Sequence, residues 1–255
     1  MKLRPWVFIP DCHHPFCDVK AYRLLIKVMV YIENTYGLRG LCILGDFLDL
    51  YGLSFWEKDD SLGSLSELYD REMAVGNTCL DEFDTLFPKA QKIFIEGNHE
   101  FRLKKYINKY AGALRNRLSV VTELNLDKRS KWTWVPYTKL QKVQIDGSPL
   151  YARHEPFGSS QPKTQAAKSG DSFIYGHTHQ VGEGHYITKL TGRDVVAINA
   201  GSLIDMKAKV FDYVKNRPDW KHAFVVAWVN KETFHVQIIR INKDYTCMFD
   251  GKLFK

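Results

Sequence analysis

The chain has 255 residues, 45% of them hydrophobic and 25% charged, and its formal net charge is +7 at pH 7. This composition is that of a globular chain long enough for one sizeable core, and it excludes a chain that is disordered throughout. No run of about 18 apolar residues occurs and the N-terminus resembles a first strand more than a signal peptide, so we expect a cytoplasmic protein without a membrane span.

The first half of the chain alternates between predicted strands and predicted helices. Residues 18–37 predict a helix, because Asp18 can cap its start, apolar side chains recur at helical spacing and Gly37 can end it. Such alternation predicts parallel strands joined by helical crossovers. The predicted strands are residues 6–10, 41–44 and 92–95, and further helix is predicted over residues 61–87 and 101–110.

The segment 101–118 combines a helical pattern with a run of positive charge. Leu103, Tyr106, Ile107 and Tyr110 recur at helical spacing and predict one buried face. The same segment holds several cations and no acid, which suits either contact with nucleic acid or an ordinary solvated helix face. These cations are Arg102, Lys104, Lys105, Lys109, Arg115 and Arg117.

After about residue 130 the chain changes to short runs rich in β-branched and aromatic residues, which predict strands. We therefore expect an α/β protein with two facing mixed β-sheets and helices outside. A single domain over residues 1–255 is expected, since no linker or repeat interrupts the chain. Within it, residues 54–88 are interpreted as a helical insertion or crossover, and residues 181–255 as a strand-rich part that completes the second sheet.

Polar side chains follow five of the predicted strands at the point where each strand ends. The five segments are "DCH" (11–13), "GDFLD" (45–49), "GNHE" (97–100), His154 in "YARHEP", and "GHTH" (176–179). Ligands of α/β sheets bind beyond the carboxyl ends of the strands, because loops converge there on a rigid base. We therefore expect these five segments to meet at one site.

The side chains in these segments are oxygen and nitrogen donors without a thiolate. Such a mixed set suits Mn, Fe, Ni, Co or Zn, and seven donors are too many for one tetrahedral ion. Two metals that share a bridging carboxylate would accommodate them. The donors are Asp11, His13, Asp46, Asn98, His154, His177 and His179.

The five segments, in this order, resemble the motifs of the calcineurin-like metallophosphoesterase superfamily. "NAGS" (199–202) is similar to the turn that often follows the last motif, and "GNHEFRL" is similar to small bacterial and phage members. The resemblance implies a four-layer αββα sandwich. It also implies two divalent cofactor ions, with Mn²⁺ favoured over Fe, Ni, Co, Zn and Mg.

The resemblance also implies a role for each motif residue. One metal would take Asp11, His13, Asp46 and His179, and the other Asp46, Asn98, His154 and His177, with Asp46 bridging. A hydroxide bridging the two ions would attack the phosphoester. His99 would face the substrate phosphate and leaving group, and Asp49 would hold His99 by a hydrogen bond.

Several neighbouring residues have alternative interpretations. His14 could replace His13 as the ligand, although the Asp-x-His spacing favours His13. Glu100 is expected to support its turn without binding metal. Arg102 follows His99 by three residues and is a candidate substrate-binding residue, with a surface arginine as the alternative. Phe55 and Trp56 could stack on a base or belong to the core.

The remaining histidines and the cysteines are expected to lie outside the chemistry. His185, His222 and His235 fall in strand-like runs and are interpreted as packing or surface residues. The cysteines are widely spaced and lack a CxxC pair, which argues against a disulfide framework and against a thiolate zinc site. Cys12 is interpreted as a small filler that points away from the site. The cysteines are Cys12, Cys17, Cys42, Cys79 and Cys247.

The leading functional hypothesis is a metal-dependent phosphoesterase, specifically a phosphodiesterase acting on a nucleotide or nucleic acid, because the chain carries surplus positive charge. The alternative within the superfamily is a phosphomonoesterase or protein phosphatase, which carries "GNHE". In such phosphatases the second motif ends in Asp-Arg-Gly, whereas here Leu50 and Tyr51 follow Asp49 and the arginine is absent. A metal-binding scaffold without catalysis is the alternative of another class. The sequence leaves the oligomeric state open.

Overall fold

The computed structural model describes residues 2–54, 64–138, 141–158, 161–212 and 219–255. Phe55 and Trp56, which were interpreted as stacking or core residues, lie outside the described residues. None of the described helices has the length and apolar character needed to cross a membrane.

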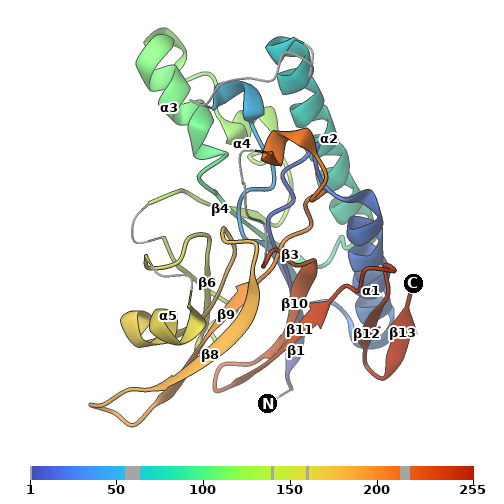
Figure 1. The fold of residues 1–255 in the computed structure, drawn as a ribbon, viewed down its shortest axis with the longest axis vertical. Coiled ribbons are helices and arrows are strands. Elements are labelled where there is room, and N and C mark those ends of the chain that lie inside the picture. Colours follow the sequence, from blue (N-terminus) through green and yellow to red (C-terminus); the bar gives the residue numbers. More distant parts are fainter. Residues whose placement is uncertain (1, 55–63, 139–140, 159–160, 213–218) are drawn as a thin grey trace.

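The first sheet has six strands in the order β11-β10-β1-β2-β3-β4 (Figure 1). Four of them are parallel: β1 (Arg4–Ile9), β2 (Gly40–Ile43), β3 (Gln91–Ile95) and β4 (Trp132–Val135). The other two, β10 (Ala223–Val229) and β11 (Phe234–Arg240), pair antiparallel along the free side of β1. The parallel strands β1 to β3 are almost wholly buried, as expected for strands covered on both faces.

The second sheet has five strands in the order β5-β6-β7-β9-β8. Its centre is parallel, from β6 (Leu150–Arg153) through β7 (Ser172–Tyr175) to β9 (Asp194–Ala200). The edges β5 (Val143–Gln144) and β8 (Val181–Ile187) pair antiparallel. A separate hairpin, β12 (Cys247–Phe249) and β13 (Lys252–Phe254), lies beside α1 near the C-terminus (Figure 1).

The prediction that residues 181–255 complete the second sheet is correct only for β8 and β9. Strands β10 and β11 instead extend the first sheet, because β10 pairs with β1 over five residue positions. Pairing between chain segments more than 200 residues apart leaves no local pattern in the sequence. The C-terminal part therefore contributes to both sheets.

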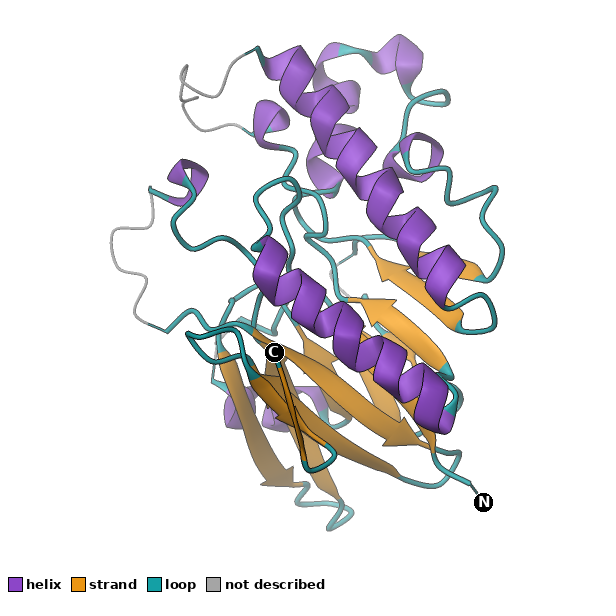
Figure 2. Ribbon diagram, turned by 90° about the vertical axis from the view of Figure 1, so that its right-hand side faces the viewer, coloured by secondary structure: helices purple, strands orange, loops and turns teal. Residues whose placement is uncertain are grey.

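The two sheets face each other across an apolar layer, and helices cover their outer faces (Figure 2). Helices α1 (Val19–Tyr36) and α2 (Leu65–Leu86) lie outside the first sheet, and α5 (Pro162–Ser169) lies against β8 and β9. The architecture is the αββα sandwich that the sequence predicted. Inside it, Trp6, Phe8, Leu44 and Ile95 of the first sheet pack with residues of the second, among them Leu150, Ile174 and Ile198.

Helix α1 begins directly after the predicted capping residue, Asp18. Asp18 accepts hydrogen bonds from the main-chain N–H groups of Lys20 and Ala21, and so it satisfies donors at the start of α1. Helix α2 runs from β2 towards β3 as the expected crossover, and Ser64 caps its start. Two shorter helices follow, α3 (Phe101–Tyr110) and α4 (Val120–Glu123).

The predicted buried face of α3 is wrong for its two tyrosines. Leu103 and Ile107 are buried, whereas Tyr106 is 42% exposed and Tyr110 is 60% exposed. Both tyrosines line a surface pocket with Leu53, at the end of the short 3-10 helix η1 (Tyr51–Leu53). Helix α3 therefore presents an aromatic edge to solvent beside the loop that follows β2.

Candidate metal centre

The five polar segments meet at one end of the two sheets, as predicted. Asp11 follows β1, Asp46 follows β2, and Asn98 follows β3, while His154 and His177 follow β6 and β7. Asp46 has φ 47° and His177 has φ 69°, backbone values in the left-handed region that few non-glycine residues adopt. Such strain gathers at functional sites, where the surrounding structure enforces it.

Two glycines allow the loops to approach closely. A Cβ atom at Gly97 would collide with the Asp46 carboxylate, and one at Gly176 would collide with the Asp11 carboxylate. The main-chain N–H of His177 donates to both oxygens of Asp11, at 2.9 and 3.0 Å. Glycine therefore occurs in these motifs because two loop backbones must pass directly against buried carboxylates.

The donor side chains form two groups that could each hold an ion. In each group, ligand atoms of three residues lie within 4.8 Å of one another. One group contains Asp11, His13 and His179, and the other contains Asp46, His154 and His177.

Asp46 lies between the two groups and offers one oxygen to each. Its Oδ1 is 3.3 Å from His154 Nε2, and its Oδ2 is 3.7 Å from His13 Nε2. These separations exceed an ordinary hydrogen bond. They are close to the roughly 3–3.5 Å expected between two ligands of one ion with bonds of about 2.0–2.2 Å. The Asp46 carboxylate thus faces both donor groups, one oxygen towards each.

Asn98 joins the second group through its amide oxygen. Asn98 Oδ1 is 2.9 Å from His154 Nε2 and 2.8 Å from His177 Nδ1. The three polar atoms thus point at one another from β3, β6 and β7. Asn98 is one of the predicted donors, and the structure brings it to the group that contains Asp46.

Hydrogen bonds on the far side of two imidazole rings turn their other nitrogen towards the donor cluster. His154 Nδ1 donates to the main-chain carbonyl of Leu44 at 2.8 Å, so Nε2 is the atom that faces Asp46. His13 Nδ1 lies 2.7 Å from the carboxylate of Asp49, and its buried Nε2 has no hydrogen-bond partner among the described residues. Metal-binding histidines are commonly oriented in this way by a carbonyl or a carboxylate.

The contact between Asp49 and His99 differs from the one expected. His99 Nδ1 is 2.7 Å from the main-chain carbonyl of Asp49 but 3.5 Å from its carboxylate, whose shorter bond goes to His13. A tight loop, in which Leu50 has φ 51°, turns the carbonyl towards His99. Asp49 therefore orients two imidazoles, His13 through its side chain and His99 through its backbone.

Arg102 is held at the site and is not a free surface arginine. Its guanidinium donates to the Asp49 carbonyl at 3.0 Å and contacts His99 Nε2 at 2.9 Å. The carbonyl can only accept, so His99 carries its proton on Nδ1, and Nε2 accepts from Arg102. An ion on Nε2 would meet this positive charge, so the contact disfavours His99 as a ligand, although its ring nitrogen lies within 4.8 Å of ligand atoms of His13 and Asp46.

Glu100 supports the loops from behind, as predicted. Its buried carboxylate accepts main-chain N–H groups from Gly97 at 2.8 Å, Asp46 at 3.0 Å and Leu48 at 2.8 Å. The single side chain therefore ties the loop after β3 to the loop after β2. Burial and the nearby Asp46 charge raise the pKa of Glu100 to about 7.

The site is strongly polarised by its carboxylates. Burial opposes ionisation, but His154, His99 and His13 outweigh it and hold the pKa of Asp46 well below its usual range. Burial also opposes protonation of His154, yet the charges of Asp46 and Asp11 raise its pKa to about 10. Burial lowers the pKa of His99, and Asp46 and Asp49 together reverse that effect, so that its pKa is raised. This field favours cations at the site, whether protonated imidazoles or metal ions.

The donor set fits divalent ions on three grounds. The set mixes carboxylates, imidazoles and one amide, which suits Mn²⁺ and its neighbours. Buried nitrogens lack hydrogen-bond partners among the described residues, namely His13 Nε2 and His179 Nδ1. The carboxylate of Asp46 is shared between two donor groups.

The other histidines lie away from these donors. The ring of His14 packs against Phe47, with ring centroids 4.7 Å apart, so His13 is the residue of this pair that faces Asp46. His185 is exposed beside Asp194, His222 Nε2 bonds to the carbonyl of Ile204, and His235 lies on β11. These positions agree with their interpretation as packing or surface residues.

Two aromatic residues beside the imidazoles were not recognised in the sequence. The Trp220 ring lies edge-on to His179 with centroids 4.5 Å apart, and the Phe211 ring lies edge-on to His13 at 5.6 Å. They help to enclose one side of the first donor group. Neither follows a predicted strand, so no local signal could have identified them.

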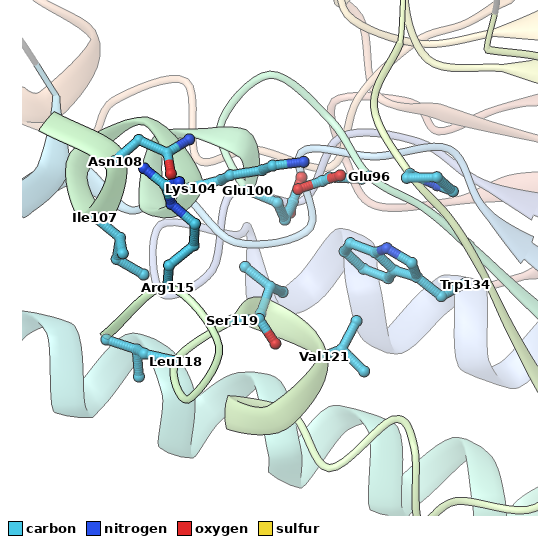
Figure 3. Close-up of a pocket in the computed structure, with 12 residues that line it drawn as sticks. Glu96, Glu100, Lys104, Ile107, Asn108, Arg115, Leu118, Ser119, Val121 and Trp134 are labelled. Carbon is cyan, nitrogen blue, oxygen red and sulfur yellow. The ribbon is translucent and has the colours of Figure 1, made fainter. Parts of the chain in front are cut away.

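A cavity of about 570 Å³ adjoins the site on the α3 side (Figure 3). Glu96, Glu100, Lys104 and Arg115 give it a polar wall, and Trp134 contributes an apolar side. None of the seven predicted donors lines it. Only Glu100 is common to this cavity and the loop network, so the cavity and the donor cluster are separate features.

Comparisons with known proteins return structural likeness only. No protein-family model matches the chain, and no curated protein matches it significantly. Vps29 of Chaetomium thermophilum has a TM-score of 0.46 and 11% identity over 96% of this chain and 95% of that chain. A single mutant of Vps29 from Entamoeba histolytica has a TM-score of 0.42 and 12% identity over 98% and 95%. The nuclease MPE of Pseudomonas putida has a TM-score of 0.38 and 14% identity over 88% and 82%. At these values the likeness assigns no role to any residue.

Proposed function

We propose that this chain is a dinuclear-metal-dependent phosphoesterase, and specifically a phosphodiesterase acting on a nucleotide or nucleic acid. The observation that carries the proposal is the position of Asp46, with one oxygen towards His154 and the other towards His13. A carboxylate shared between two oxygen and nitrogen donor groups is the core of a two-metal site. His99 and Arg102, held together beside it, supply groups that can contact a phosphate.

In this proposal each ion takes four donors and Asp46 serves both. His154 and His13 would bind through Nε2, because their Nδ1 atoms already bond to Leu44 and Asp49. The first ion would take Asp11, His13, Asp46 and His179, and the second Asp46, Asn98, His154 and His177. Two divalent ions, of which Mn²⁺ suits the donors well, would supply an activated water and neutralise phosphate charge.

The protein groups beside the ions would orient the substrate and stabilise charge. Arg102 presents a planar guanidinium suited to bidentate contact with phosphate oxygens, and the Asp49 carbonyl holds it near the site. If a phosphate draws Arg102 away from His99, the Nε2 of His99 becomes free to take up a proton from solvent, which its raised pKa favours, and that proton could pass to the leaving oxygen. The Asp49 carbonyl keeps the Nδ1 proton in place throughout, so the ring keeps its orientation.

The surface of α3 supports a substrate with bases. Arg102, Tyr106 and Tyr110 recur every four residues and therefore lie along one side of the helix. The two tyrosine rings are 5.1 Å apart and exposed. Exposed aromatic rings beside a cationic group form a platform on which bases of a nucleotide or single strand can stack. A phosphate at Arg102 would leave the adjoining base within reach of Tyr106.

The proposal is tested by hydrolysis of a chromogenic phosphodiester, a phosphomonoester, cyclic nucleotides and single-stranded DNA, each with added Mn²⁺. We expect diester hydrolysis by the native chain and its loss in Asp46→Asn, because the variant loses the bridging charge. Asp194→Asn, at an exposed pair with His185, is the matched control and should retain activity.

Other results would redirect or refute the proposal. Hydrolysis confined to the monoester would support the alternative of a phosphomonoesterase or protein phosphatase. Two bound metals with no hydrolysis of any phosphoester would support a metal-binding scaffold instead.

A further inference from the structure

A second group of potential metal ligands lies in the core on the helix side of the first sheet. Sulfur atoms of Cys12 and Cys17 and a ring nitrogen of His14 all lie within 4.8 Å of one another. The three side chains are 0%, 7% and 4% exposed. They come from one loop after β1, yet they share no side chain with the seven donors described above.

The imidazole of His14 lacks the partners that a buried polar ring needs. Its Nε2 has no hydrogen-bond partner among the described residues, and its ring is packed between Tyr22 and Phe47. Leaving a buried nitrogen without a hydrogen bond is a cost to the folded state. The thiols make only weak contacts with carbonyls, from Cys12 to Pro10 at 3.3 Å and from Cys17 to Leu203 at 3.2 Å. A ligand that engaged all three groups would remove this cost.

Helix α2 carries a further buried thiol. Cys79 is 8% exposed and belongs to the same apolar cluster as Cys12 and Cys17. It does not belong to the group whose ligand atoms lie within 4.8 Å of one another. The group itself therefore supplies two thiols and one imidazole, and Cys79 is a candidate for a fourth ligand from the same part of the core.

We propose that Cys12, His14, Cys17 and Cys79 form a structural zinc site, separate from the dinuclear centre. Three sulfurs and one nitrogen are a common structural Zn²⁺ ligand set, with bonds of about 2.3 Å to sulfur and 2.0–2.1 Å to nitrogen. Tetrahedral geometry then separates the ligand atoms by roughly 3.5–3.8 Å, so Cys12, His14 and Cys17 need only a small contraction, whereas Cys79 would have to move towards them. Zinc here would fix the loop that carries Asp11 and His13 against α2.

The wide spacing of the cysteines in the sequence argued against a thiolate zinc site, and the fold removes that objection. Cys12 and Cys17 lie near His14, and both belong to one apolar cluster with Cys79 of α2. The spacing of the cysteines in the sequence does not predict this arrangement. The site lies in the core, so zinc would enter while the chain folds.

Cobalt substitution distinguishes this site from the oxygen and nitrogen donors. The full chain would be produced in Co²⁺ medium and purified with a reductant, and its cobalt content and near-ultraviolet absorption measured. Only a thiolate ligand gives a sulfur-to-cobalt charge-transfer band. We expect the native chain to show that band. The band should be absent when the chain is refolded with excess Zn²⁺. In Cys17→Ser it should fall by more than half.

A matched control and a second variant make the result decisive. Cys42→Ala alters a buried thiol that lies between the two sheets and not in this group, so it should keep the full band. If Cys17→Ser does not fold, His14→Gln provides the test in its place, and it should shift or weaken the band. A native chain that binds cobalt without the band overturns the proposal, as does a band unchanged in both cluster variants. Three inert thiols packed as small apolar groups would give the first of these results.

Discussion

His99 is predicted to be required for turnover but not for metal binding. Its Nδ1 is fixed by the Asp49 carbonyl and its Nε2 faces Arg102. We expect His99→Asn to retain both metals while turnover falls by about 10²–10⁴-fold, the usual contribution of a positioned acid or base. Metal analysis and steady-state kinetics on one preparation measure both quantities. Loss of a metal in this variant would instead make His99 a ligand.

Glu72 of α2 is a buried acid that was not recognised in the sequence. It is fully buried, its Oε1 accepts the N–H of Tyr51 at 3.0 Å, and its Oε2 has no hydrogen-bond partner among the described residues. Burial, with the nearby Asp49 charge, raises its pKa from 4.5 to about 8. The folded state therefore holds a proton that the unfolded chain loses above pH 4.5.

The sign of the resulting pH effect follows from this proton. The free energy of unfolding should fall as pH rises from about 4.5 to about 8, by up to roughly 1.4 kcal/mol per pH unit from this group. We expect Glu72→Gln to be less sensitive to pH than the native chain in urea unfolding at pH 5.5 and 7.5. Glu67→Gln, at an exposed position on the same helix, is the control. Equal pH dependence of the native chain and Glu72→Gln would contradict the shifted pKa.

At the scale of elements, helix α3 carries both a buried face and a solvent-exposed aromatic edge. Tyr106 and Tyr110 contribute little to the core, because 42% and 60% of their surfaces are exposed. We expect replacement of both by alanine to raise KM for single-stranded DNA by about 10-fold or more, since stacking contributes roughly 1–3 kcal/mol per base. Hydrolysis of a small chromogenic diester, which has no bases, should change little.

The control for this experiment is another exposed aromatic residue away from the site. Tyr36→Ala alters a side chain at the end of α1 that bonds to Asp250. It should leave KM for DNA unchanged. If the double tyrosine variant also leaves KM unchanged, α3 is not the surface that binds bases.

At the scale of the whole molecule, the candidate metal centre joins the two sheets. Asp11, Asp46 and Asn98 follow strands of the first sheet, whereas His154 and His177 follow strands of the second. Ions shared between these residues would bind the folded chain and not the unfolded one. Metal at a free concentration of 100 times the Kd of a site raises the free energy of unfolding by about 2.7 kcal/mol. Removal of the metal should therefore lower the free energy of unfolding by about that amount for each such site.

Thermal unfolding with and without Mn²⁺, after chelation, measures this effect. Asp46→Asn should show a smaller rise in Tm on addition of Mn²⁺ than the native chain, because the shared ligand is weakened. An identical rise in both would indicate that Mn²⁺ stabilises the fold at another place. Asp194→Asn again provides the matched control, since Asp194 lies on an exposed pair.

Much of the architecture could be predicted because its signals are local. Alternating strands and helices, the cap at Asp18 and the glycine turns before Asp46 and His177 are all properties of a few adjacent residues. Parallel strands bring their carboxyl ends to one edge of a sheet, which accounts for the convergence of three loops in the first sheet and of two in the second. The sequence itself thus determined which polar residues end each strand, whereas the packing of the two sheets brings their edges together.

The contacts that only the tertiary structure decided depend on atoms far apart in the chain. The Asp49 carboxylate turns to His13 because the loops after β1 and β2 pack together, and β10 joins β1 across more than 200 residues. The same long-range packing exposes Tyr106 and places Cys12 and Cys17 in one apolar cluster with Cys79 of α2. Short-range patterns specify which residues follow a strand. Packing between elements determines which atoms face each other, and the energies of that packing cannot be derived from a local sequence pattern.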